Sequence, residues 1–502
     1  MFFREEMQMR RSGILLPISS IPSKYGIGSF SKEAYEFVDF LVEAGQKLWQ
    51  ILPLGPTGYG DSPYQSFSTF AGNPYFIDLD EFIELGYITK EDCERLNFGT
   101  NPEYVDYGQL YNNRYLLLEK AYDSALAEGL EADEEYQAFL KENKYWLTDY
   151  ALYRTVKRAF DNACWTEWDE DIRLRHPAAI KRYSKEYAYE IGFYYFLQYF
   201  FTKQWKALKA YANEKGIEIV GDIPIYVAFD SADSWANPEL FQLDEDNFPI
   251  GVAGCPPDAF SETGQLWGNP LYNWEYHKET KFAWWLKRIA HCYELYDVVR
   301  IDHFRGFDEY WFVPYGDETA QNGHWEPGPG IELFKAMKRK FGKLQVIAED
   351  LGFLTSSVLQ LLEDTGFPGM KVLQFAFGGD AKNLYLPHNH KQNCVVYTGT
   401  HYNETTTGWY HNLNDWTRGH VNKYFGLTDG KGINWKFIQV ALSSVADTAI
   451  IPMQDYLGLG NEARINTPSS FGKNWEWRMK KDACTKELAA KMKELAIIYG
   501  RL

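Results

Sequence analysis

Short apolar runs that end in polar residues, glycine or proline recur along the whole chain. Runs of this kind, rich in β-branched residues, are typical of strands buried on both faces of a parallel sheet. Eight of them are predicted to be strands: Gly13–Pro17, Lys47–Leu54, Ile217–Val227, Val298–Phe304, Gln345–Gly352, Lys371–Phe377, Cys394–His401 and Ala449–Tyr456.

Segments with helical periodicity lie between several of these runs. In residues 31–44 the apolar positions recur every three or four residues, with Ser31 as the predicted N-cap and Gly45 just after the helix. Residues 331–341 and 356–363 repeat the pattern. Eight strands alternating with helices favour a (β/α)8 TIM barrel, an α/β fold. A doubly wound open sheet is the alternative, which alternation alone leaves open.

Two long intervals interrupt this alternation. Residues from about 61 to 215 are polar, rich in Tyr, Glu and Lys, and helical in periodicity, so they are predicted to form inserted helical subdomains on the barrel rim. Residues from about 229 to 276 are rich in glycine and proline, and they are predicted to form the lid and rim of an active site. We therefore expect residues 1–502 to form a single catalytic barrel domain with two insertions.

Composition and charge restrict the possible partners. The chain has 502 residues with 51 Lys and Arg against 69 Asp and Glu, a formal charge of −18. An acidic surface repels phosphate backbones and anionic lipid, so we expect no nucleic acid and no membrane as partner. The 17 Trp, 36 Tyr and 33 Phe are mostly explained by core packing, and their number also fits stacking on sugar rings.

The cysteines and the first residues of the chain suggest a reducing compartment. The six cysteines are scattered without a CxxC pair, which is typical of reduced thiols. Residues 1–11 are charged and lack the apolar core of a signal peptide, and no apolar stretch is long enough to span a membrane, so we expect a cytoplasmic protein.

No motif indicates a cofactor or a metal. A complete glycine-rich nucleotide-binding motif is absent from the sequence, and no carboxylate or cysteine cluster accompanies His388-Asn389-His390. We therefore expect no cofactor and no metal site, with His388-Asn389-His390 in a surface loop.

Carboxylates end three neighbouring predicted strands. Asp222, Asp302 and Glu349 stand where a barrel exposes its reactive groups. Cleaving a glycosidic bond with retention needs one ionised carboxylate to attack and one protonated carboxyl to donate a proton. Arg300 shares a strand face with Asp302 and would keep it ionised, whereas the apolar run 346–348 before Glu349 would raise the pKa of that carboxyl. A buried ion pair with a purely structural role is the alternative.

Several motifs carry a resemblance to a known family. The segments RIDHFRG (300–306) and IAEDLG (347–352) resemble the nucleophile and acid/base strands of the amylomaltases, the 4-α-glucanotransferases of glycoside hydrolase family 77. The stretch 254–272, GCPPDAFSETGQLWGNPLY, is similar to the family's loop over the active site. GDSPYQ (60–65), GDIPIY (221–226) and QDYLGLGN (454–461) also match, and the similarity extends from about residue 13 to 477.

The resemblance implies a barrel with inserted subdomains and a specific activity. Members of this family transfer segments of α-1,4-glucan to glucose or another glucan acceptor through a covalent glycosyl-enzyme. The implied partners are therefore maltooligosaccharides and other α-1,4-glucans, with glucose as an acceptor.

The resemblance also implies residue roles. Asp302 would be the nucleophile and Glu349 the general acid/base. The sugar at the point of cleavage, in the −1 subsite, and the acceptor-side sugars would be bound by Tyr64, Asp222, Gln265, Trp267, Arg300, His303 and His401. Ordinary packing is the alternative for Tyr64 and Trp267, as is a structural role for His401.

One position departs from the family pattern. Gly-Thr-His-Asp-Asn is expected, but residues 399–403 read Gly-Thr-His-Tyr-Asn, so Tyr402 stands in place of a third catalytic Asp that binds the sugar 2- and 3-hydroxyls. A neutral phenol cannot supply charged hydrogen bonds, and losing ~3–4 kcal/mol would slow turnover ~10²–10³-fold. Glu404 is an alternative source of the carboxylate. A weakened glucan-binding or regulatory protein, or an α-glucan hydrolase, are the alternatives for the whole chain.

Overall fold

The computed structural model describes residues 10–58, 60–257, 261–352, 354–468, 470 and 472–502. Residues 1–9, on which the prediction of no signal peptide mainly rests, lie outside this part of the chain, as do residues 258–260 of the predicted lid.

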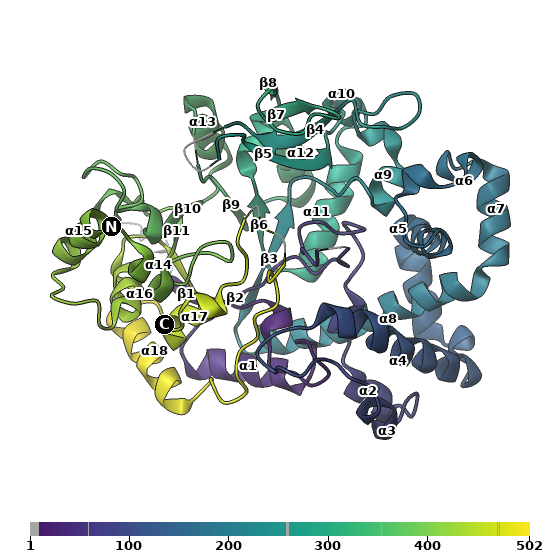
Figure 1. Ribbon diagram of the computed structural model, residues 1–502, viewed down its shortest axis with the longest axis horizontal. Helices are drawn as coiled ribbons and strands as arrows, with labels where there is room; N and C mark the ends of the chain where they lie inside the picture. Colours follow the sequence, from purple (N-terminus) through teal and green to yellow (C-terminus); the bar gives the residue numbers. More distant parts are fainter. Residues whose placement is uncertain (1–9, 59, 258–260, 353, 469, 471) are drawn as a thin grey trace, which may run out of the picture.

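Eight parallel strands close into a barrel (Figure 1). In spatial order they are β1 (Arg11–Leu15), β12 (Thr448–Pro452), β11 (Cys394–Tyr397), β10 (Gly369–Val372), β9 (Val346–Ala348), β6 (Val298–Asp302), β3 (Glu218–Pro224) and β2 (Leu48–Gln50). Each predicted strand overlaps one barrel strand. The predicted (β/α)8 barrel is confirmed, and the open-sheet alternative is wrong because β1 pairs with both β2 and β12.

The barrel strands are shorter than the apolar runs that predict them. The run 47–54, for example, is hydrogen-bonded as a strand only over Leu48–Gln50. Residues 51–54 of that run continue beyond the strand. Apolar side chains fill the barrel interior, with one or two from each strand: Leu15, Leu48, Val220, Val298, Ile347, Met370, Val372, Val395, Tyr397 and Ile450.

Helices surround the barrel. The predicted helices at 31–44, 331–341 and 356–363 correspond to α1 (Lys32–Glu43), α12 (Ile331–Phe341) and α13 (Ser356–Thr365). Ser31 is the N-cap residue of α1, but its side chain makes no capping hydrogen bond, because its hydroxyl pairs with Ser23 and Glu33 instead. The remaining helices on this part of the fold are α11 (Ala283–Leu295), α14 (Thr406–Asn412), α15 (Asp415–Phe425), α16 (Ile433–Ser443), α17 (Met453–Leu457) and α18 (Lys486–Ile498).

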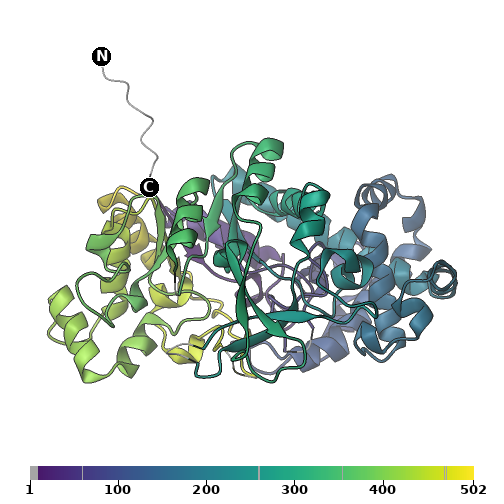
Figure 2. The same ribbon diagram turned by 90° about the horizontal axis from the view of Figure 1, so that it is seen from above.

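The interval between β2 and β3 is helical, as its periodicity indicates. It contains α2 (Leu79–Glu84), α3 (Lys90–Glu94), α4 (Tyr107–Ala127), α5 (Glu134–Ala159), α6 (Glu170–Arg173), α7 (Pro177–Glu186) and α8 (Ala188–Glu214). Figures 1 and 2 show these helices, in blue, gathered at one end of the molecule, with α14 to α16 at the other. The last helix, α8, leads directly into β3 and contacts it, so the insertion is anchored on the barrel.

A small antiparallel sheet lies beside the barrel and was not predicted. Its order is β5 (Gln265–Pro270), β4 (Gly251–Cys255), β7 (Glu309–Pro314) and β8 (His324–Pro327). A Cβ on Gly254 would lie 2.4 Å from the carbonyl oxygen of Gln265, so this glycine allows β4 and β5 to approach. Part of the predicted lid is therefore regular structure, because β4 and β5 both lie within residues 229–276. Two short helices, α9 (Ala232–Ala236) and α10 (Trp274–Glu279), flank β4 and β5 in sequence.

The thiols and the helices bear on the expected compartment. Cys93, Cys164, Cys292, Cys394 and Cys484 are free thiols, and Cys93, Cys292 and Cys394 are buried. Within the described ranges, no helix combines the length and the apolar character needed to cross a bilayer.

Candidate active site

Three adjacent strands bring the candidate catalytic residues to one edge of the barrel. Asp222 on β3 is in register with Arg300 on β6, and Ile301 is in register with Ala348 on β9. The main chain continues this pairing beyond β9, because the Glu349 N–H donates to the Ile301 carbonyl at 3.0 Å. Asp302 and Glu349 therefore leave the barrel side by side.

Arg300 connects the acids of β3 and β6. Its Nη1 donates to both carboxylate oxygens of Asp222 at 2.7 Å, and its Nη2 lies 3.0 Å from Oδ1 of Asp302. The Arg300 and Asp222 side chains are 1% and 0% exposed, whereas that of Asp302 is 30% exposed. Burial raises the pKa of Asp222 to about 6, although the Arg300 guanidinium opposes this. Of Arg300, Asp222 and Asp302, only the partly exposed Asp302 is thus accessible to a ligand.

Glu349 is held by two main-chain donors. The His303 N–H donates to its Oε2 at 2.8 Å and the Leu351 N–H to its Oε1 at 3.1 Å. His303 can present its N–H because its backbone is left-handed, with φ of 54°, which is uncommon for a residue other than glycine. Burial, and next the negative charge of Asp302, raise the pKa of Glu349 to about 7. The carboxyl can therefore both give and take a proton near neutral pH.

The small sheet brings two further predicted residues to the site. The Trp267 ring meets the His303 ring edge-on, with centroids 4.7 Å apart and planes at 89°. The Trp267 indole N–H donates to Oε1 of Gln265 at 3.2 Å, so both side chains lie on the same face of β5. Burial lowers the pKa of His303 to about 3, and this imidazole is neutral near pH 7.

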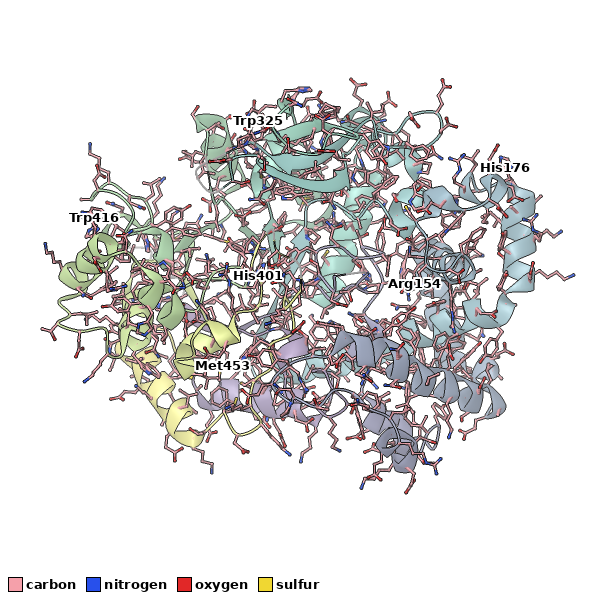
Figure 3. The ribbon with its side chains drawn as sticks, in the orientation of Figure 1. Arg154, His176, Trp325, His401, Trp416 and Met453 are labelled. Carbon is pink, nitrogen blue, oxygen red and sulfur yellow. The ribbon has the colours of Figure 1, made fainter. Side chains whose placement is uncertain are left out.

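Tyr64 and His401 form a stack beside Asp222. The Tyr64 hydroxyl donates to Oδ2 of Asp222 at 2.8 Å, and its ring stacks on His401 with centroids 5.1 Å apart and planes at 17°. Burial lowers the pKa of His401 well below its usual value, so its ring is neutral. In Figure 3 the labelled His401 lies near the centre of the molecule, beside the barrel strands.

Tyr402 lies within the charged centre of the site. Its ring packs edge-on against His401, with centroids 5.0 Å apart, and its carbonyl accepts from Arg464 at 2.9 Å. Burial, and next the charge of Glu349, raise the pKa of this phenol well above its usual value, so it is neutral. Glu404 accepts hydrogen bonds from Asn412 and Asn461, which ties its carboxylate to α14 and the segment after α17.

The structure brings together the residues predicted for the active site and adds two. Tyr226 is buried beside Trp267 and His303, with ring centroids 6.3 and 6.4 Å from theirs. Trp475 contacts the Tyr64–His401 stack from the far end of the chain. Tyr226 lies in the GDIPIY segment, so its motif could have identified it. Trp475 carries no such signal, because its contacts depend on how the C-terminal segment folds back.

The acidic and thiol groups do not gather into a metal site in the part of the chain that the structure describes: no group of three or more His, Cys, Asp or Glu has that arrangement there. His388, singled out in the sequence with His390, is exposed and bonded to Tyr424, whereas His390 is buried against the Tyr385 carbonyl.

Comparison with known proteins decides the family. The model of glycoside hydrolase family 77, described as 4-alpha-glucanotransferase, matches residues 16–485. This chain belongs to that family. A 4-alpha-glucanotransferase of Clostridium butyricum is 53% identical over 96% of this chain and 99% of its own. A 4-alpha-glucanotransferase of Streptococcus pneumoniae is 49% identical over 99% of this chain and 98% of its own.

Solved structures agree with this assignment. The amylomaltase of Streptococcus agalactiae in complex with acarbose has a TM-score of 0.95 and is 45% identical, covering 98% of this chain and 99% of that one. The amylomaltase of Corynebacterium glutamicum shares the fold, with a TM-score of 0.77. It is 17% identical, and the match covers 98% of this chain and 75% of that one. The predicted family, the 4-alpha-glucanotransferase activity and the class of substrate, α-glucans, are confirmed. The relatives give no support to a binding protein or a hydrolase.

Proposed function

We propose that this chain transfers α-1,4-glucan segments by a double displacement in which Asp302 is the nucleophile and Glu349 the general acid/base. One observation supports this proposal most: an ion-paired, partly exposed carboxylate lies beside a carboxyl whose pKa is about 7. Retaining cleavage requires an attacking carboxylate next to a carboxyl group that can donate a proton.

In the first step an Asp302 oxygen bonds to the anomeric carbon while the glycosidic bond breaks. The Glu349 proton passes to the departing 4-oxygen, and the rest of the glucan leaves. In the second step a sugar 4-hydroxyl attacks the same carbon, gives its proton to Glu349 and releases Asp302. Glucose and maltooligosaccharides are the proposed acceptors.

The surrounding residues have proposed binding roles. Arg300, His303, His401, Tyr64 and Asp222 hold the sugar at the point of cleavage, and their support is the network of short contacts around Asp222. Gln265 and Trp267 on β5 contact the acceptor-side sugars and exclude water. Their position beside His303 supports this role.

Tyr402 is proposed to weaken the activity without abolishing it. Its phenol is neutral, so it contributes no charged hydrogen bond to the sugar, and Glu404 is engaged elsewhere. The nucleophile and the acid/base remain in place, which leaves the chemistry possible at a lower rate.

We also propose that the chain acts as one catalytic domain with insertions at about 61–215 and 229–276, and that it works in the cytoplasm. The anchoring of α8 on β3 supports the single domain. The buried, unpaired thiols of Cys93, Cys292 and Cys394 fit a reducing compartment.

Incubation with maltotriose tests the proposed function. Transfer predicts a ladder of longer maltooligosaccharides together with glucose. Glucose without a ladder would show hydrolysis instead, and binding without any product would show a protein that has lost the chemistry. The Asp302→Asn variant is the control, and it is expected to give no ladder.

A further inference from the structure

Trp416, the second residue of α15, is the most exposed tryptophan. It is 64% exposed, whereas the other 16 tryptophans, all within the described residues, are buried or half-buried. Most of the apolar area of this ring stays in contact with solvent, so the side chain contributes little to folding from this position. Figure 3 shows Trp416 at the edge of the molecule, away from His401.

Two further rings continue from Trp416 along α15. His420 and Tyr424 follow at intervals of four residues, so the three side chains lie on one face of the helix over about 12 Å. The Trp416 and His420 centroids are 5.7 Å apart. His388 extends the row by stacking on Tyr424 with centroids 5.9 Å apart and planes at 27°. Trp416, His420, Tyr424 and His388 are called the α15 aromatic row.

The row is held in place from beneath. The fully buried ring of Phe377 meets both His420 and Tyr424 edge-on, at 5.9 and 5.5 Å. The Phe377 carbonyl also accepts from Nδ1 of His420 at 3.3 Å. A surface whose rings are fixed in advance loses little conformational entropy when a ligand stacks on it.

The row also offers polar atoms at its edges. His420 donates through Nδ1, and in the neutral tautomer with that N–H its Nε2 is an acceptor without a partner among the described residues. The Tyr424 hydroxyl donates to Nδ1 of His388 at 3.0 Å while Nε2 of His388 donates to the Ala381 carbonyl, so the Tyr424 oxygen retains acceptor capacity. Flat apolar faces bordered by acceptors suit a ligand with apolar ring faces and outward hydroxyls.

Its place in the fold connects the row with the substrate. Phe377 and His388 follow β10, and α15 follows β11 and His401, so the row lies on segments that leave the carboxyl ends of barrel strands, as the catalytic residues do. The protein carries a net charge of −18, which favours a neutral ligand over an anionic one.

We propose that the α15 aromatic row is a surface binding site for α-1,4-glucan chains, separate from the active site. The proposal rests on the proposed function for its class of ligand. A glucan chain lies along the row with its sugar rings on Trp416, His420 and Tyr424, and this holds long substrates near the enzyme. Short substrates, which occupy the active site alone, do not use it.

Affinity electrophoresis in gels with and without amylopectin tests the site. Trp416→Ala should bind amylopectin about five- to tenfold more weakly than the unchanged protein, which corresponds to one lost stacking contact. Trp416→Phe should recover part of the loss because a ring remains. Tyr189→Ala, which removes a 47% exposed aromatic residue from α8, is the control and should bind normally.

Maltotriose turnover by the same proteins separates this site from the active site. Trp416→Ala should retain the unchanged protein's rate of ladder formation, and a matching fall in that rate would overturn a separate site. Equal retardation of Trp416→Ala and the unchanged protein would also overturn it. If maltotriose gives a ladder but amylopectin retards Trp416→Ala and the unchanged protein equally, this inference alone is refuted. If the retardation by amylopectin depends on Trp416 but no ladder forms, only the proposed transferase is refuted.

Discussion

The main-chain N–H of His303 donates to Oε2 of Glu349 at 2.8 Å. The residue that follows the proposed nucleophile therefore helps to hold the proposed acid/base in position. This contact stabilises the ionised form of Glu349, yet burial and the charge of Asp302 outweigh it, and the pKa of Glu349 remains near 7.

The raised pKa of Glu349 predicts a fall in activity on the alkaline side. The first step needs the protonated carboxyl, so kcat/KM for maltotriose should fall as the pH rises through about 7. Initial rates across this range measure it. With α-maltosyl fluoride, whose leaving group departs without a proton, the fall should be absent from the first step. An identical fall with both substrates would contradict the assignment of Glu349 as the acid.

Replacing Tyr402 with Asp should raise the rate. The added carboxylate restores charged hydrogen bonds to the sugar, which are worth several kcal/mol in the transition state, so kcat for maltotriose should increase about 10²–10³-fold. Tyr402→Phe is the control, since it removes only the hydroxyl and adds no charge. An unchanged or lower rate for Tyr402→Asp would show that the site around the phenol cannot use a carboxylate.

Removing Arg300 should destabilise the fold. Arg300→Met leaves the fully buried carboxylate of Asp222 without its cation, which costs about 3–5 kcal/mol. Urea denaturation measures the change. The double variant Arg300→Met, Asp222→Asn removes the unpaired charge and should recover part of the loss. Equal stability of the two variants would mean that the unpaired Asp222 carboxylate costs nothing, which would contradict this prediction.

Trp267 should decide whether sugar or water completes the reaction. Trp267→Ala opens the acceptor side beside His303, so the share of glycosyl-enzyme lost to water should rise about tenfold. The ratio of free glucose to longer products measures it. Leu266→Ala is the matched control, because Leu266 is 40% exposed and alternates to the other face of β5. A similar product ratio in both variants would remove Trp267 from this role.

The barrel could be predicted well from the sequence, because each strand coincides with a separate apolar run that ends in polar residues, glycine or proline. The sheet of β4, β5, β7 and β8 was not predicted. The strand β4, GVAGC, is short and rich in glycine, and β8, HWEP, is mostly polar and partly or fully exposed, so neither shows a strand period. Their pairing depends on contacts between distant segments.

The residues of the candidate site were predicted from strand ends and motifs, but the contacts between them could not be predicted. The spacing of Arg300 and Asp302 indicates a shared face, but nothing local in the sequence shows that Arg300 also binds Asp222 across the β3–β6 ladder. The contacts of Trp475 with Tyr64 and His401 likewise join residues more than 70 positions apart.

Trapping the glycosyl-enzyme tests the central claim most directly. A fluorinated α-glucosyl fluoride, which forms the covalent intermediate faster than it is hydrolysed, should add one sugar to the chain. Digestion and mass spectrometry should place that sugar on Asp302, and Asp302→Asn should remain unlabelled. A label on another residue, or equal labelling of the Asp302→Asn variant, would contradict the account.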